Sequence, residues 1–182
     1  MSRIPTPASI DDAPAASQPM LKSVMGRMGR VPNIYRIAAN SPIALKGLLD
    51  LSQTLSEGEL PAADRERIAI AVAETNGCDY CLSAHTYLAK HVAKLSDLEI
   101  SANRNGRSID LGADAVVHLA TELVRTRGHV RDTDVAAVKE AGYSDAELLE
   151  IVLHAALNTF TNYLNEAFET EIDFPSISTR AA

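Results

Sequence analysis

The chain has 182 residues, of which 46% are hydrophobic and 23% charged, so it can bury the core of one globular domain. Seventeen Lys and Arg residues stand against 24 Asp and Glu residues, a formal net charge of −7. This acidic balance argues against a nucleic-acid-binding protein, because binding phosphates needs a basic surface. No segment approaches the ~18 uncharged apolar residues of a membrane span or has the pattern of a secretory signal. We therefore expect a cytoplasmic location, with neither a nucleic acid nor a membrane as partner.

The first 18 residues differ in composition from the rest of the chain. They are rich in Pro, Ala and Ser and lack apolar periodicity, so residues 1–18 are predicted to form an arm, either disordered or wrapped on a neighbouring subunit. Beyond them the pattern is helical nearly throughout. Ser41 followed by Pro42 is typical of a helix start, and Leu45 and Leu48 belong to the apolar stripe behind it.

Two consecutive helices are predicted in the middle of the chain. Pro61 opens the first of them, and Asn76 with Gly77 ends it. The second helix is expected from about Cys78 to Lys94. Because only a short turn separates the two, they should form an antiparallel pair.

Four helix starts are visible in the C-terminal half. The segments Ser96–Glu99 and Ser144–Glu147 both have the pattern of a capping box. Asp110 and Thr133 are further candidate caps. The helices expected after Asp110, Thr133 and Ser144 span about 111–127, 133–141 and 145–168.

No segment of four or more residues alternates convincingly between apolar and polar side chains, so no strand is predicted. The expected fold is an all-α helical bundle, with one domain over residues 19–175 and a tail over 176–182. Aromatic residues make up only 4% of the chain, so such a small bundle buries a modest area per residue. The long apolar last helix is therefore interpreted either as a subunit interface or as the central core helix.

The only two cysteines lie in one motif, Cys78-Asp79-Tyr80-Cys81. In a reducing cytosol this spacing indicates thiol redox chemistry or metal ligation. On a helix, Cys78, Cys81 and His85 share one face. The helix N-terminus favours a thiolate at Cys78, whereas the neighbouring imidazole favours one at Cys81.

A carboxylate is expected beside His85. Glu66 lies ten residues before Asn76 and His85 nine after it, so a helical hairpin about Asn76 would place the two side by side. A carboxylate holds an imidazole in one tautomer and raises its basicity, so that His85 could take the proton of Cys81. In this arrangement Glu66 would orient the base, His85 would be the base and Cys81 the nucleophile.

Other interpretations of the motif remain open. The two thiols could be buried and inert. A zinc site would have only Cys78, Cys81 and His85 as ligands, all on one helix, without a fourth at a recognisable spacing.

Four other histidines have no evident partner and are interpreted as structural or exposed: His91, His118, His129 and His154. A polar stripe on the last helix is interpreted as an interface or a solvated seam rather than a cavity lining: Asn158, Asn162 and Asn165. Tyr80 and, less so, Tyr87 are candidates for the border of a substrate pocket.

The pattern of Glu66, eleven residues, Cys78-x-x-Cys81, three residues and His85 resembles the signature of alkylhydroperoxidase AhpD. It is also similar to the redox-active branch of the wider carboxymuconolactone decarboxylase-like superfamily. The resemblance covers about residues 20–170. Outside the motif it is carried by the runs 71–90, 130–151 and 161–168.

The resemblance implies an all-helical subunit of a trimer or hexamer that reduces hydroperoxides with a cysteine pair. Carried over, Cys81 is the nucleophile that attacks the peroxide and Cys78 is the resolving thiol. His85 is then the proton acceptor and Glu66 its partner. No cofactor and no metal are expected. The electron donor would be an external dithiol, either a dihydrolipoyl group on a carrier protein or a thioredoxin-like protein.

One position departs from the family pattern. The best-studied members have a further His immediately before the second cysteine, where this sequence has Tyr80, and a phenol is a poor base near neutral pH. The decarboxylase branch lacks the cysteine pair, so lactone decarboxylation is not expected. The alternatives to a peroxidase or disulfide oxidoreductase are a non-catalytic redox-responsive oligomer and a superfamily member with other small-molecule chemistry.

Overall fold

The computed structural model describes residues 2–180, and within this range it contains nine α-helices and no strand. The all-α fold is therefore confirmed. None of these helices is both long and apolar enough to cross a membrane. In chain order the helices are α1 (Gln18–Met28), α2 (Asn33–Ala38), α3 (Pro42–Ser56), α4 (Ala62–Asn76), α5 (Asp79–His91), α6 (Asp97–Asn103), α7 (Leu111–Arg125), α8 (Asp132–Glu140) and α9 (Asp145–Phe168).

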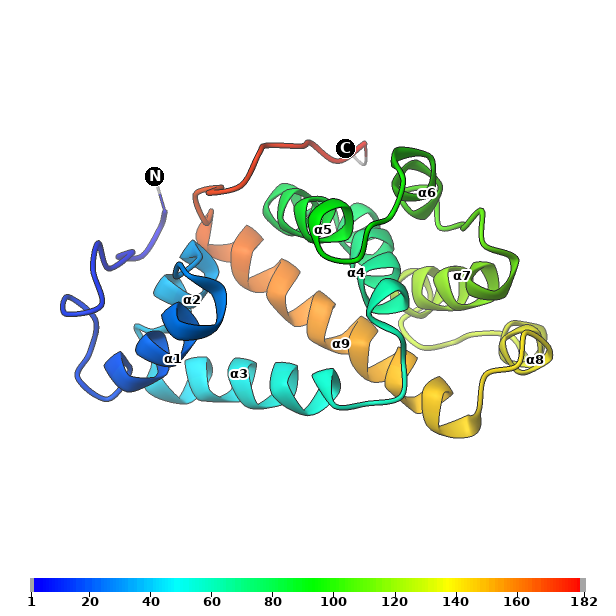
Figure 1. Ribbon diagram of the computed structural model, residues 1–182, viewed down its shortest axis with the longest axis horizontal. Coiled ribbons are helices and arrows are strands. Elements are labelled where there is room, and N and C mark those ends of the chain that lie inside the picture. Colours follow the sequence, from blue (N-terminus) through cyan, green and yellow to red (C-terminus); the bar gives the residue numbers. More distant parts are fainter. Residues whose placement is uncertain (1, 181–182) are drawn as a thin grey trace.

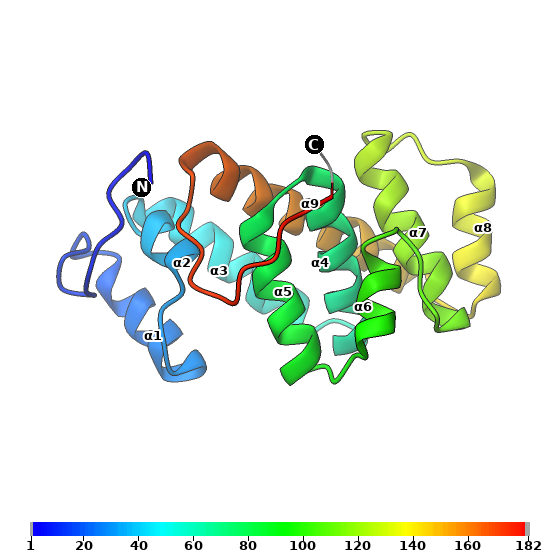
Figure 2. The same ribbon diagram turned by 90° about the horizontal axis from the view of Figure 1, so that it is seen from above.

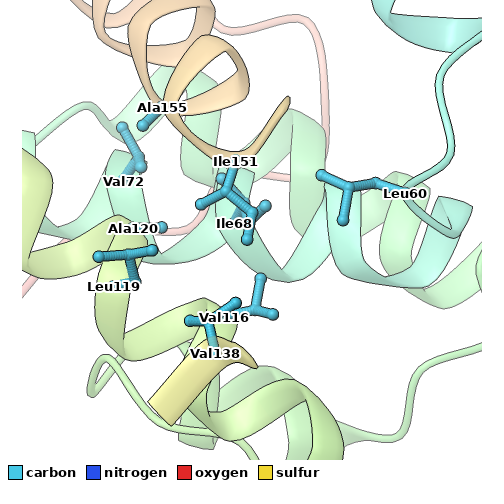
Figure 3. Packing of buried hydrophobic residues seen from close by; sticks show 9 residues of the cluster. All are labelled: Leu60, Ile68, Val72, Val116, Leu119, Ala120, Val138, Ile151 and Ala155. Carbon is cyan, nitrogen blue, oxygen red and sulfur yellow. The ribbon is translucent and has the colours of Figure 1, made fainter. Parts of the chain in front are cut away.

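The long helix α9 runs through the middle of the molecule, with α1–α3 towards one end and α6–α8 towards the other (Figure 1). Helix α4 packs against α5, α7 and α9. In the core at this junction Ile68 of α4 faces Ile151 of α9, and Val116 and Val138 lie beside them from α7 and α8 (Figure 3). Helix α9 is thus the central core helix, although several of its apolar side chains remain exposed.

Several predicted helix starts are present with their expected caps. The Ser41 hydroxyl accepts a hydrogen bond from the Ala44 N–H at 3.2 Å. The Asp110 carboxylate accepts from the N–H groups at the start of α7. Ser144 and Glu147 cap one another's backbone N–H groups at 3.1 and 2.8 Å, the reciprocal pattern of a capping box.

Two predicted caps differ from the structure. Thr133 does not cap α8, because the helix begins one residue earlier and the Asp134 carboxylate accepts from the Arg131 N–H at 3.0 Å. Ser96 does cap the Glu99 N–H, but the Glu99 carboxylate does not return to Ser96. It instead binds the buried guanidinium of Arg67 at 2.7 Å, an interaction between helices that outweighs the local cap.

The N-terminal segment lies along its own chain. The Arg3 N–H donates to the Phe168 carbonyl at 2.8 Å, and the Asn40 amide donates to the Pro5 carbonyl at 2.7 Å. Ala13 is buried in a core that includes Leu21 of α1. The arm expected to be disordered or wrapped on a neighbouring subunit is therefore seated on its own helices, because its backbone and one small side chain find partners there.

The last described residues form a strap over α5. Figure 2 shows the segment after α9 running along α5 towards α4 and α6. The Ile177 N–H donates to the Ser83 hydroxyl at 2.9 Å, and the Thr179 N–H donates to the Asp79 carboxylate at 2.7 Å. The predicted tail is thus held, over residues 176–180, on the helix that carries the cysteines. Its residues 181–182, like the first residue of the arm, lie outside the described range.

Candidate active site

The two cysteines lie at the N-terminal end of α5. Gly77 adopts a left-handed conformation, with φ of 72°, and so turns the chain sharply from α4 into α5. Cys78 is the N-cap of α5, and its sulfur accepts from the Cys81 N–H at 3.4 Å. Both cysteines are free thiols, with 0% of Cys78 and 3% of Cys81 exposed.

The hairpin brings Glu66 of α4 against His85 of α5. The Glu66 Oε2 and His85 Nδ1 atoms are 2.9 Å apart, so the spacing of the two residues about the turn produces the expected contact. Burial lowers the pKa of His85, but the charge and hydrogen bond of Glu66 outweigh it, and the net pKa is raised. His85 is thus a stronger base than a free imidazole, with Cys81 close enough to add to that rise.

Helix α9 supplies the polar groups that contact the sulfur of Cys81. The Asn165 amide donates to the Cys81 sulfur at 3.1 Å, and the Thr161 hydroxyl lies 4.0 Å from it. The Asn162 carbonyl accepts from the Asn76 amide at 2.8 Å, which ties α9 to the turn before the cysteines. The interpretation of this asparagine stripe as an interface or solvated seam is therefore wrong: its members are buried and face the cysteine motif and the neighbouring cavity.

The two thiols differ in acidity. Hydrogen bonding from the Cys78 thiol lowers the pKa of Cys81 to about 6 against the opposing effect of burial, with further lowering by His85 and by the Asn162 and Asn165 amides. The same hydrogen bond, together with burial, raises the pKa of Cys78. In the sequence, the helix N-terminus favoured a thiolate at Cys78 and the imidazole favoured one at Cys81. With its lowered pKa, Cys81 is the more acidic of the two thiols.

A cavity of about 350 Å³ opens beside Cys81. Glu66 and His85 line it together with Cys81, so the three groups face one space. Most of the wall is apolar, and its apolar members include Met28, Ile34, Leu48, Leu55, Leu88 and Phe174. A cavity of this kind suits an organic molecule with an apolar body better than a small hydrophilic one.

The two tyrosines have different places. Tyr80 lines the cavity, donates from its hydroxyl to the Asp173 carboxylate at 2.8 Å and accepts from the Ile34 N–H at 3.2 Å. Burial raises its pKa, so it remains a neutral phenol and does not act as a base. Tyr87 is exposed and stacks on His91, with ring centroids 4.4 Å apart, outside the cavity wall.

Of the four histidines without a predicted partner, three have no place at the site. His91 and His129 are exposed, and the His118 ring lies 3.5 Å from the Asp134 carboxylate. His154 is different, because it is buried and lines the cavity. Nothing local in the sequence marks it, since most of the other residues that line the cavity come from helices α1–α5. Among residues 2–180, no three or more His, Cys, Asp or Glu side chains are grouped so that they could hold a metal ion.

Comparison with known proteins agrees with the motif. The model of the carboxymuconolactone decarboxylase family matches residues 42–125, the stretch that contains Glu66, both cysteines and His85. The match covers slightly less than half of the chain, and over this stretch the chain is similar to that family. Among curated protein sequences, none matches the chain significantly.

Solved structures share the fold. The AhpD core of an uncharacterized peroxidase-related protein from Ralstonia eutropha JMP134 is 22% identical, with a TM-score of 0.84 over 94% of this chain and 92% of that one. A peroxidase-related protein from Silicibacter sp. TM1040 is 21% identical, with a TM-score of 0.81 over 93% and 91% of the two chains. The debrominase Bmp8, as a cysteine-to-alanine variant in complex with 2,3,4-tribromopyrrole, is 20% identical, with a TM-score of 0.79 over 95% and 94%.

Proposed function

We propose that the protein is a thiol-dependent hydroperoxide reductase that uses Cys81 and Cys78 as a redox pair. The observation that carries this proposal is the position of Cys81: an acidic thiol at the wall of an apolar cavity, beside a His85–Glu66 pair. The family match over residues 42–125 and the peroxidase-related structural neighbours support this proposal, and we place the activity in the cytoplasm.

The cycle begins when the Cys81 thiolate attacks the terminal oxygen of a hydroperoxide ROOH. The O–O bond breaks, Cys81 becomes a sulfenic acid, and the leaving alkoxide takes the proton held by His85 to give ROH. Glu66 stabilises the imidazolium in the preceding step, when His85 holds the proton of Cys81. The Asn165 amide stabilises the thiolate by its hydrogen bond.

The resolving step closes the disulfide. The Cys78 sulfur attacks the Cys81 sulfenic acid, the S–O bond breaks, and water leaves with the proton of Cys78. The net reaction converts ROOH and two thiols into ROH, water and one disulfide. An external dithiol, on a dihydrolipoyl carrier or a thioredoxin-like protein, then reduces the disulfide through a mixed disulfide.

Mass spectrometry after one equivalent of cumene hydroperoxide tests this proposal. The reduced protein should lose two daltons, mapped to the peptide with Cys78 and Cys81, and one equivalent of cumyl alcohol should appear. With excess dihydrolipoamide, many equivalents should be reduced per subunit. A disulfide that forms without such turnover would instead identify a redox-responsive module, and an unchanged mass would rule out both.

A second candidate function is the reductive removal of a halogen from an organic ring. The apolar cavity beside Cys81 and the shared fold of the debrominase favour it. As in the peroxide reaction, two thiols supply the two electrons: R–Br and two thiols give R–H, bromide, a proton and the disulfide. Bromide release from 2,3,4-tribromopyrrole, measured beside the peroxide assay, decides between the two substrates.

We further propose that the protein is a homo-oligomer that assembles through α9. A stripe of large apolar side chains on this helix is 40–73% exposed and follows helical spacing: Leu149, Val152, Leu153, Phe160 and Tyr163. Light scattering should give the mass of a trimer or hexamer for the wild type and of a monomer for Leu149→Glu/Phe160→Glu. The circular dichroism of this variant should be unchanged, and a monomeric wild type would contradict the proposal.

A further inference from the structure

His154 of α9 is a buried titratable residue of the cavity to which the proposed cycle gives no role. It is only 5% exposed, and its Nε2 atom has no hydrogen-bond partner within residues 2–180. A buried polar atom without a partner is unfavourable, because it has lost its hydrogen bonds to water. Since His154 lines the cavity, a molecule bound there lies beside this imidazole.

The position of His154 along α9 fixes its place relative to the reactive sulfur. His154, Asn158, Thr161 and Asn165 follow one another at intervals of four, three and four residues, so they share one face of the helix. Thr161 and Asn165 contact the sulfur of Cys81. His154 lies two turns before Thr161, roughly 10 Å along the helix axis. The cavity therefore has the reacting sulfur at one end of this face and an imidazole at the other.

The chemical character of the imidazole narrows what it can bind. Burial, followed by the positive charge of Arg65, lowers the pKa of His154 to about 4, while the carboxylates of Glu150 and Glu66 oppose this and His85 adds to it. His154 is uncharged at neutral pH, with one ring nitrogen that donates and one that accepts a hydrogen bond. Such a group pairs with an uncharged carbonyl, hydroxyl or amide.

We propose that His154 is a substrate-binding residue that selects organic hydroperoxides with an apolar body and an uncharged hydrogen-bonding group at the end remote from the peroxide. This assignment rests on the proposed function for the reaction at Cys81, but the binding that it describes needs no turnover. A purely hydrocarbon hydroperoxide fills the same apolar walls and leaves His154 unpaired, so it should bind more weakly.

Calorimetry with the two product alcohols tests the assignment. Cumyl alcohol has only a hydrocarbon ring, and its para-carboxamide analogue adds one uncharged polar group. The wild type should bind the carboxamide about tenfold more tightly, as expected for one additional buried hydrogen bond. His154→Leu should lose this preference, and His154→Gln, which can still donate and accept, should keep part of it. As a matched control, Leu157→Val on the same wall should weaken both alcohols alike.

Each outcome has one meaning. Equal affinity of the wild type for the two alcohols, binding of neither, or an unchanged preference in His154→Leu would overturn the role of His154. The matching hydroperoxides are then assayed for turnover. If the alcohols bind with the expected preference but neither hydroperoxide is reduced, the peroxidase proposal fails while His154 retains its role in binding. If both hydroperoxides are reduced equally well by the wild type and by His154→Leu, the peroxidase proposal stands and the role of His154 in substrate selection fails.

Discussion

Replacement of Cys81 by Ser is expected to lower peroxide-dependent turnover at least about a thousandfold, because a neutral hydroxyl cannot replace a thiolate as the attacking group. The structure gives this residue the acidic thiol, the Asn165 hydrogen bond and a place on the cavity wall. The measurement is dihydrolipoamide-dependent reduction of cumene hydroperoxide. Turnover at the wild-type rate in Cys81→Ser would exclude this cysteine as the nucleophile.

The matched control is Cys78→Ser, which removes the other sulfur from the same helix end. This variant should consume one equivalent of peroxide and stop, with a sulfenic acid at Cys81 that a dimedone-type reagent traps.

Labelling of the wild type by iodoacetamide gives an independent measurement of the acidity of the two thiols. Because the pKa of Cys81 is lowered to about 6, its labelling rate should rise with pH to half its maximum near pH 6, while Cys78, with a raised pKa, reacts little.

Replacement of Arg67 by Met is expected to destabilise the fold by about 3–5 kcal/mol, because it leaves buried carboxylates without a counter-charge. Arg67 of α4 has a side chain only 11% exposed, and its guanidinium binds Asp64 at 2.7 Å and Glu99 at 2.7 Å. Glu99 also accepts from the Ser108 hydroxyl and the Ile109 N–H, so this cluster joins α4, α6 and the segment before α7. Chemical denaturation at pH 7 gives the loss directly.

Two further variants separate charge burial from a general loss of packing. Arg67→Met/Glu99→Gln removes one of the uncompensated charges and should recover part of the lost stability. Lys139→Met breaks an exposed pair with Asp145 and should leave the denaturation midpoint close to that of the wild type. Equal stability of Arg67→Met and the wild type would show that this cluster contributes nothing to the fold.

Local patterns in the sequence were sufficient for much of the fold. The caps at Ser41, Asp110 and Ser144 depend on residues within one turn of each other, and each is present in the structure. The prediction that Thr133 caps α8 was wrong, because the Asp134 carboxylate accepts from the Arg131 N–H and these two residues form the start of the helix. Glu99 has the spacing of a cap, but its burial beside an arginine of α4 overrides that local role.

The sequence alone determined the parts of the candidate site that one hairpin fixes. A tight turn at Gly77 and two regular helices place Glu66 beside His85, and one helix places His85 near Cys81, because helix geometry fixes the relation of residues at these spacings. Only the tertiary structure decided what covers the sulfur. Asn165 is 84 residues from Cys81 and reaches it because α9 packs across α4 and α5, which depends on the shapes of buried surfaces along the whole helix. The same packing placed His154 in the cavity, where no neighbour in the sequence could have shown it.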